Sequence, residues 1–141
     1  MRSVIAREYL EQISKNERII KNKQFERDFW LGMATNTTAK LGGERVQTSG
    51  NKQTMETQVI EAIQAEEDIE RLKQEIADII STIQRLSAED YDLLHQVYVQ
   101  HKSLKEIHIE AERSYSWATT THQRALERLQ KLLDNEKGAG D

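Results

Sequence analysis

The strongest pattern in this sequence is an apolar seam within residues 55–86. Its members recur at alternating spacings of three and four residues: Ile69, Leu72, Ile76, Ile79, Ile83 and Leu86. This spacing places apolar side chains along one side of a long helix, and that side has to pack against another helix. The nearest candidate partner is the segment from Val4 to Ile20, which has its own amphipathic helical pattern. The seam therefore predicts a helical hairpin, and a homodimer through the same seam is the alternative.

Further apolar residues lie outside this seam. On the long helix, Val59, Ile60 and Ile63 widen the stripe, which indicates packing against more than one helix. The N-terminal half carries a second set at helical spacing: Phe25, Phe29, Trp30 and Met33. The first helix therefore either continues or restarts after the polar residues 21–24.

Composition supports an all-α class. The 141 residues include no Pro and only six Gly, and 37% are hydrophobic against 31% charged, which suits helices that are apolar on one side. The absence of Cys excludes disulfides and thiolate metal sites. No apolar run approaches the roughly 18 residues that a membrane span needs, and the N-terminus has no signal-peptide pattern. We therefore expect a cytoplasmic protein without a membrane partner.

Three regions follow from the patterning. Residues 1–86 form the predicted helical hairpin or coiled-coil module, with a mobile loop at 35–54 where Thr, Asn, Gly, Ser and Lys replace the periodic residues. Residues 87–135 form a second domain, and residues 136–141 a disordered tail. Within the second domain, Ser87-Ala-Glu-Asp90 resembles a capping box and Ser103-Leu-Lys-Glu106 is a better one, and each predicts the start of a helix.

A last helix follows Ser114. Its apolar stripe consists of Ala118, His122, Ala125, Leu126, Leu129, Leu132 and Leu133. A helix, a short helix, a brief turn and a long helix predict a helix-turn-helix DNA-binding domain.

The string from Leu104 to Leu129 resembles the region 4 motif of sigma factors. Glu106-Ile107 and Arg124-Ala125-Leu126 match that motif, and the 18-residue offset from Ile107 to Ala125 agrees with its spacing. The turn departs from the motif, because Glu112 stands where a Gly is usual and Arg113 where an apolar residue is usual.

Over nearly the whole chain, the order of segments is similar to phage late-transcription regulators of the RinA/ArpU type. The segments are Tyr9-Leu-Glu-Gln-Ile13, Val46-Gln-Thr-Ser-Gly50, the acidic long helix and the region 4 unit. The resemblance implies a phage or prophage activator that binds promoter DNA near late, packaging or lysis genes. It also implies contact with host RNA polymerase.

The last helix offers a polar face to double-stranded DNA. Gln123 and Arg124 suit base edges, since Gln pairs with adenine and Arg with guanine. Four hydroxyl side chains near the start of the helix suit phosphate oxygens: Ser114, Ser116, Thr119 and Thr120. Four cationic residues are candidate contacts to the DNA backbone: Lys102, Lys105, Arg113 and Arg128. For Trp117 we expect partial burial beside a contact to DNA.

Two other functions stay open. A phage small terminase subunit also joins a helix-turn-helix to coiled-coil helices, although it usually places the DNA-binding unit first. A helical protein-interaction module, with a regulatory protein as partner and no DNA binding, fits the net charge of −4. Opposite net charges make residues 1–53, at +4, the natural partner of residues 54–86, at −5.

An enzyme is not expected. The sequence has no nucleophile elbow or Gly-rich phosphate loop, and its His residues lack metal-ligand spacing, so we predict no catalytic residue, metal or cofactor.

Overall fold

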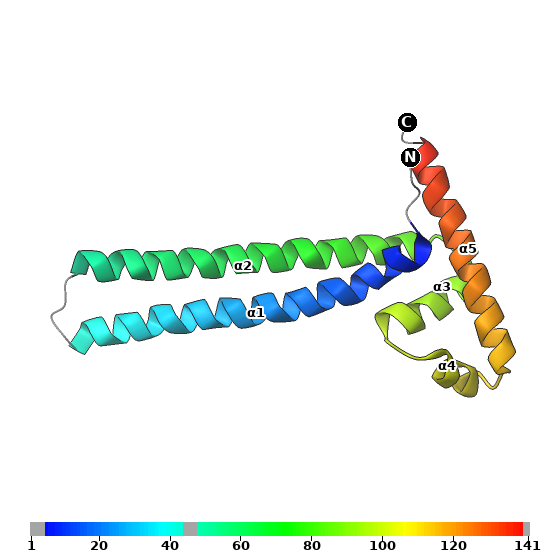
Figure 1. Cartoon of the computed structure of the whole chain (residues 1–141), viewed down its shortest axis with the longest axis horizontal. Coiled ribbons are helices and arrows are strands. Elements are labelled where there is room, and N and C mark those ends of the chain that lie inside the picture. The colour runs from blue at the N-terminus through cyan, green and yellow to red at the C-terminus, as the bar shows by residue number, and fades with distance from the viewer. Residues whose placement is uncertain (1–4, 44–47, 140–141) are drawn as a thin grey trace. The chain divides into compact units, whose positions relative to one another are not determined.

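The computed structural model describes the backbone of residues 5–43 and 48–139, and the side chains of residues 5–35 and 54–136. Its elements are α1 (Ala6–Gly43), α2 (Thr48–Ile83), α3 (Ala88–Leu94), the π-helical segment η1 (His95–Val99), α4 (Leu104–Glu110) and α5 (Tyr115–Ala139) (Figure 1). The predicted all-α class and the order of a long hairpin followed by shorter packed helices are confirmed. Within the described ranges, no helix is both long and apolar enough to cross a membrane.

Both hairpin helices are longer than the sequence pattern predicts. α1 is unbroken through residues 21–24 and reaches Gly43, and α2 begins at Thr48, so the loop predicted over residues 35–54 is corrected; residues 44–47 lie outside the described residues. Thr, Asn and Lys each cost a helix less than about 0.7 kcal/mol relative to Ala, and no Pro interrupts the segment. α1 ends at Gly42-Gly43, because Gly loses more conformational freedom in a helix than any other residue type of this segment. At the other end of the chain, α5 continues to Ala139 through most of the tail predicted over 136–141, and residues 140–141 are not described.

The structure divides into two compact units. The hairpin unit comprises Glu17–Gln74, and the core unit comprises Met1–Asn16 together with Glu75–Asp141. This division differs from the predicted boundary at residue 86, because the first turns of α1 and the last turns of α2 share an apolar core with α3, η1 and α5.

The core unit is centred on buried aliphatic side chains from four segments. These include Leu10, Ile13, Ile79, Ile83, Leu94, Ala125 and Leu129. Hydrogen bonds join the segments at the edge of this core: the Ala6 amide donates to Gln130 Oε1 over 2.8 Å, and Tyr9 Oη donates to Thr82 Oγ1 over 2.9 Å. The C-terminal half of the predicted seam is therefore filled by the chain itself.

In the hairpin unit, α1 and α2 run side by side in opposite directions (Figure 1). The contact buries Ile20 and Ala34 of α1, and Ala62, Ala65, Ile69 and Leu72 of α2. Lys23 Nζ lies 3.2 Å from Asp68 Oδ2, and Arg27 Nη1 lies 2.6 Å from Glu66 Oε1. The hydrogen bond to Lys23 lowers the pKa of Asp68. These ion pairs agree with the opposite net charges of residues 1–53 and residues 54–86.

Candidate nucleic-acid interface

α4 begins with the capping box that the sequence predicts. Ser103 Oγ accepts the Glu106 N–H over 3.1 Å, and the Ser103 N–H donates to Glu106 Oε1 over 2.9 Å. The Ser103 N–H lowers the pKa of Glu106, and so does the Ser103 hydroxyl, because both donate to Glu106 Oε1 and favour its carboxylate form. Ser87 Oγ similarly accepts the Asp90 N–H, over 3.3 Å, at the start of α3. Both predicted helix starts are confirmed to within a residue.

The turn between α4 and α5 has the hydrogen bonds of a Schellman motif. The Arg113 N–H donates to the His108 carbonyl over 3.0 Å, and the Glu112 N–H donates to the Ile109 carbonyl over 3.1 Å. Glu112 itself has a φ of 56°, in the left-handed region that favours Gly. Glu112 therefore holds a left-handed conformation at a strain of about 1 kcal/mol.

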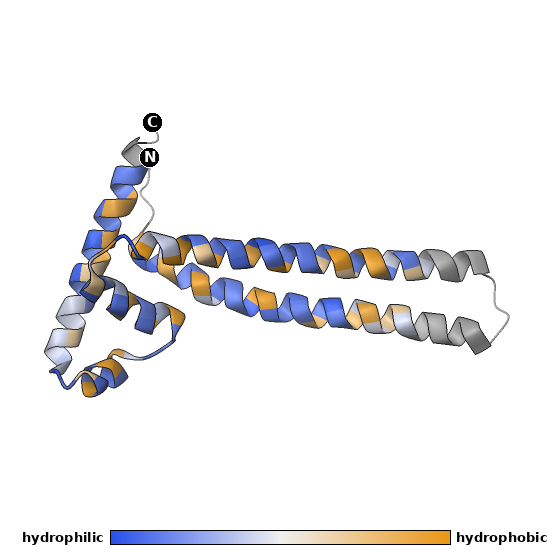
Figure 2. Ribbon diagram, turned by 180° about the vertical axis from the view of Figure 1, so that it is seen from behind, coloured by the Kyte–Doolittle hydropathy of each residue, from blue (hydrophilic) through white to orange (hydrophobic). Residues whose placement is uncertain are grey.

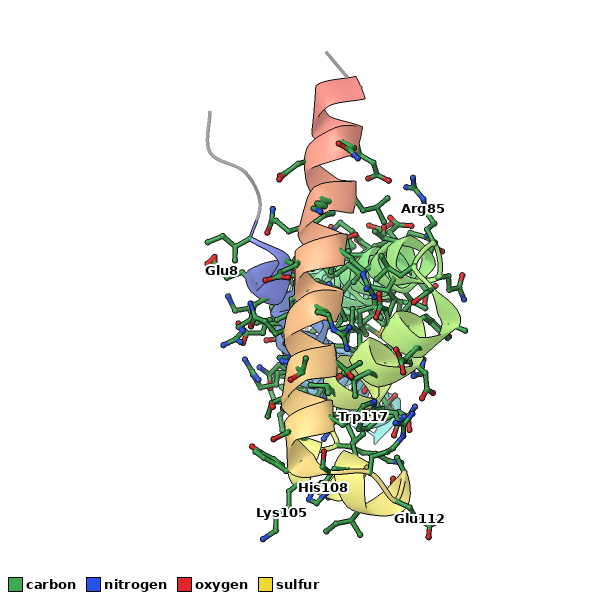
Figure 3. The ribbon with its side chains drawn as sticks, turned by 90° about the vertical axis from the view of Figure 1, so that its right-hand side faces the viewer. Glu8, Arg85, Lys105, His108, Glu112 and Trp117 are labelled. Carbon is green, nitrogen blue, oxygen red and sulfur yellow. The ribbon has the colours of Figure 1, made fainter. Side chains whose placement is uncertain are left out.

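α5 begins directly after this turn. Ser114 Oγ accepts the Trp117 N–H over 2.9 Å, so Ser114 is the residue that caps the helix. The Nδ1–H of His108 donates to the Arg113 carbonyl over 3.0 Å, and the His108 and Tyr115 rings form an edge-to-face contact with 5.5 Å between centroids. α4 therefore holds the first turn of α5 in place. Figure 3 looks onto α5, with Lys105, His108 and Glu112 around its lower end.

The two sides of α5 differ in chemistry as its periodicity predicts. The inward side is buried and includes Ala118, Thr121, Ala125, Leu126 and Leu129. The opposite side is exposed, and we call its residues within the first three turns of α5 the polar face: Ser116, Thr120, Gln123 and Arg124. Thr119 is half-buried and its hydroxyl donates to the Ser116 carbonyl over 3.0 Å, so it lies at the edge of this face.

The cationic candidates have different surroundings. Arg124 and Lys105 are exposed and make no hydrogen bond or ion pair with the described residues. Arg113 stacks on Trp117, with its guanidinium carbon 5.0 Å from the ring centroid. Lys102 Nζ lies 2.9 Å from Glu110 Oε1. Arg124 and Lys105 are therefore the cations that phosphate or bases could reach without breaking a contact.

Arg128 has a partner that the sequence pattern did not reveal. Its Nη1 donates to Asp90 Oδ2 over 2.8 Å, and Asp90 is 1% exposed. The hydrogen bond raises the pKa of Arg128, and the pair joins α5 to α3. The structure gives Arg128 a contact within the fold rather than the free position expected of a phosphate ligand. Asp90 lies three and four residues before the buried Leu93 and Leu94. This helical spacing places Asp90 on the inward side of α3, and it is the sequence feature from which the burial of Asp90 could have been predicted.

A second polar pair joins η1 to α5. Tyr98 Oη and His122 Nε2 are hydrogen-bonded over 2.9 Å, and the two rings stack at 5.8 Å between centroids. Burial lowers the pKa of His122, and the positive charge of Arg7 adds to this shift. Burial also raises the pKa of Tyr98, so both side chains are neutral at neutral pH. His122 thus has a packing role beside the polar face.

Trp117 is half-buried, as the sequence analysis expects. It lines a groove with Leu93, Ile107 and Ala111, and the carboxylates of Glu89, Asp92 and Glu110 lie around the same groove. Its indole therefore serves the packing of α3, α4 and α5, and Arg113 covers one ring face.

Comparisons with protein-family models, with curated proteins and with solved structures give no match for this chain.

Proposed function

We propose that this chain is a DNA-binding transcription regulator of a phage or prophage, and that α5 enters the major groove of promoter DNA. The observation that carries the proposal is the polar face of α5, directly after a capped short helix and a tight turn. An α-helix fits the major groove of B-DNA, and the residues near its N-terminus then meet the base edges.

The chemistry of the polar face suits sequence recognition. Arg124 has five donors in a planar fork and no partner among the described residues, so it is available for the N7 and O6 atoms of guanine. Gln123 makes only a long, 3.4 Å contact to Glu127, and its amide can pair with adenine. Each such pair discriminates between bases by about 1–3 kcal/mol.

Contacts to phosphate come from both helices of the helix-turn-helix. Ser116 and Thr120 are exposed near the start of α5, and Lys105 projects away from α4 (Figure 3). Few free cations take part, so the number of released counterions is small and we expect a shallow dependence of affinity on salt. Specificity then depends on Gln123 and Arg124 more than on bulk charge.

The resemblance to phage late-transcription regulators of the RinA/ArpU type extends the proposal from DNA binding to gene regulation. Activation of late, packaging or lysis genes through contact with host RNA polymerase is the role of the phage regulators that this sequence resembles. Glu89 and Asp92 beside the Trp117 groove provide a negative surface for a basic partner protein. The same groove is what favours a second candidate function, an interaction module that binds protein without binding DNA.

Gel-shift titrations test the proposal. The DNA is the region upstream of the neighbouring late operon, and the variant is Gln123→Ala/Arg124→Ala. The control is Gln84→Ala/Arg85→Ala, an adjacent exposed Gln and Arg just after α2; it also removes the ion pair between Arg85 and Glu136, so any general loss of fold would appear in the control as well. We expect the wild type and the control to shift the fragment and the α5 variant to lose the specific complex. No shift by the wild type at low salt, or equal losses in both variants, would contradict DNA binding through α5.

A further inference from the structure

The first turn of α1 lies along one side of α5, within the core unit (Figure 3). The Ala6 N–H donates to the side-chain carbonyl of Gln130 over 2.8 Å, which fixes the start of α1 beside the second half of α5. Arg7 is the next residue, and its side chain is exposed. Sequence periodicity places this segment in the hairpin, and only the packing of the core unit brings Arg7 next to α5.

The Arg7 guanidinium is close to the pair formed by Tyr98 and His122. Burial lowers the pKa of His122, and the positive charge of Arg7 lowers it further; burial raises the pKa of Tyr98, and Arg7 opposes that rise. Glu8 and Glu11 are the nearest carboxylates along α1, but neither forms an ion pair with Arg7. Glu8 points away from α5 (Figure 3). Arg7 is therefore an exposed cation beside α5, and no ion pair within the described residues neutralises its charge.

The cations that α5 itself supplies lie on its other side. Between residues 115 and 136 they follow one another at spacings of four and three: Arg124, Arg128 and Lys131. The opposite side begins with Tyr115, because Arg124 is nine residues, or about two and a half turns, further along the helix. Thr119 and His122 continue that side at spacings of four and three, and we call these three residues the Tyr115 side. No Lys or Arg of α5 between residues 115 and 136 lies on it.

The first turns of α5 have weakly polar side chains. Figure 2 shows them in pale colours, whereas the blue of strongly hydrophilic residues appears further along the helix. Tyr115 is 53% exposed, its ring is in edge-to-face contact with His108, and its hydroxyl makes no hydrogen bond with the described residues. A phenol O–H is a suitable donor to a phosphate oxygen. Tyr115 therefore provides an uncharged donor at the start of the Tyr115 side.

A helix in the major groove of B-DNA has a phosphate backbone on each side. The groove is about 12 Å wide and a helix with its side chains is about 10–12 Å across, so both sides of the helix approach a strand. With the polar face toward the base edges, the side with Arg124 approaches one strand and the Tyr115 side approaches the other. Along this second strand, Tyr115 and the neighbourhood of His122 are seven residues apart, or about 10.5 Å, so Tyr115 and Arg7 reach different phosphates.

We propose that Arg7 of α1 and Tyr115 of α5 bind two phosphates of one DNA strand, the strand that borders the Tyr115 side. The ligand is the phosphodiester backbone, so these contacts position α5 on the DNA without reading its sequence. The proposal rests on the proposed function, because it requires α5 in the major groove. It adds α1 to the DNA interface, beside the two helices of the helix-turn-helix.

Ethylation interference on the promoter fragment tests the proposal. An ethyl group removes the charge of a phosphate, so DNA that is ethylated at a contacted phosphate is excluded from the complex. We expect Arg7→Ala to lose the interference at one phosphate, and Tyr115→Phe to lose it at a second phosphate of the same strand. The control is Lys15→Ala, an exposed cation of α1 in the same unit, about 12 Å along the helix from Arg7, and it should keep the wild-type pattern. A wild-type pattern in Arg7→Ala, or losses on opposite strands, overturns the proposal.

The dependence of affinity on salt gives a second readout that a purely structural role of Arg7 would not change. A cation that neutralises one phosphate of B-DNA contributes about 0.9 to the slope of log affinity against log salt. Arg7→Ala should lower the slope by about this amount and weaken binding several-fold on promoter and unrelated DNA alike, with helical circular dichroism retained. Arg7→Lys keeps the charge and should keep the slope, as should Lys15→Ala. An unchanged slope in Arg7→Ala overturns the proposal.

The same gel shifts distinguish a failure of this proposal from a failure of the proposed function. If the wild type shifts the promoter fragment and Gln123→Ala/Arg124→Ala loses the specific complex, while Arg7→Ala and Tyr115→Phe behave as wild type, only the contacts of the Tyr115 side are overturned. If the wild type binds no DNA at low salt, the proposed function is contradicted, and the phosphate contacts are overturned with it.

Discussion

Arg128 of α5 donates a 2.8 Å hydrogen bond to Asp90 of α3, whose side chain is fully enclosed by the core unit. Asp90 Oδ2 has this partner, and Asp90 Oδ1 has no hydrogen-bond partner among the described residues. Removing the guanidinium would leave a buried carboxylate unpaired, which is more destabilising than never having placed a charge there.

Arg128→Met is therefore expected to lower the thermal midpoint of unfolding by several degrees, because it keeps the aliphatic stem and removes the ion pair. Asp90→Leu/Arg128→Met should recover much of the loss, since no buried charge then remains. Thermal denaturation followed by circular dichroism measures both. An unchanged midpoint in Arg128→Met would show that the pair does not support the contact between α3 and α5.

Glu112→Gly is expected to stabilise the protein by up to about 1 kcal/mol, because Gly relieves the left-handed strain at a φ of 56°. The control is Ala111→Gly at the preceding position, where φ is −82° and Gly brings only added freedom to the unfolded chain. Urea denaturation should move the midpoints of the two variants in opposite directions. Destabilisation by Glu112→Gly would mean that the Glu side chain contributes more than its backbone strain costs.

Ser103→Ala is expected to cost about 1 kcal/mol, because it removes the hydroxyl that accepts the Glu106 N–H at the start of α4. Hydrogen exchange should show the first amides of α4 losing protection. Ser81→Ala, at an exposed position inside α2, is the matched control and should be neutral or slightly stabilising. Equal effects of the two substitutions would argue against the cap.

Stability should fall in mild acid because of His122. Its pKa in the folded protein lies below the ordinary 6.5, so the unfolded chain binds the proton more readily. The free energy of unfolding is then highest above about pH 6.5 and decreases as pH falls below that value. Urea titrations at a series of pH values should show a flatter profile between neutral and mildly acidic pH for His122→Gln. The control His101→Asn, at an exposed left-handed position, should keep the wild-type profile, and a profile unchanged by His122→Gln would contradict this role.

Sequence periodicity was sufficient to predict the helices that carry an apolar stripe. The spacing of Ile69, Ile79 and Ile83 predicts a packed long helix, and Ser103-Leu-Lys-Glu106 predicts the start of α4 within a residue. These features depend on neighbours within one or two turns of the same helix, so a linear sequence contains them.

Sequence periodicity could not predict contacts between polar residues that lie far apart in the chain. Asp90 and Arg128 are 38 residues apart, and Tyr98 and His122 are 24 apart, so their pairing depends on how the helices pack. The helical turns after Thr35 were missed for another reason. Their composition resembles that of a loop, but weak helix propensity does not stop a helix that contains no Pro.

The most direct test of DNA recognition by α5 is methylation interference on the promoter fragment, with wild type and Arg124→Ala compared at low salt. Methylation of guanine N7 blocks a donor that approaches in the major groove. We expect at least one guanine whose methylation excludes DNA from the wild-type complex but not from the Arg124→Ala complex. The same interference pattern for both proteins, or none at any guanine for the wild type, would contradict recognition of guanine by Arg124 of α5.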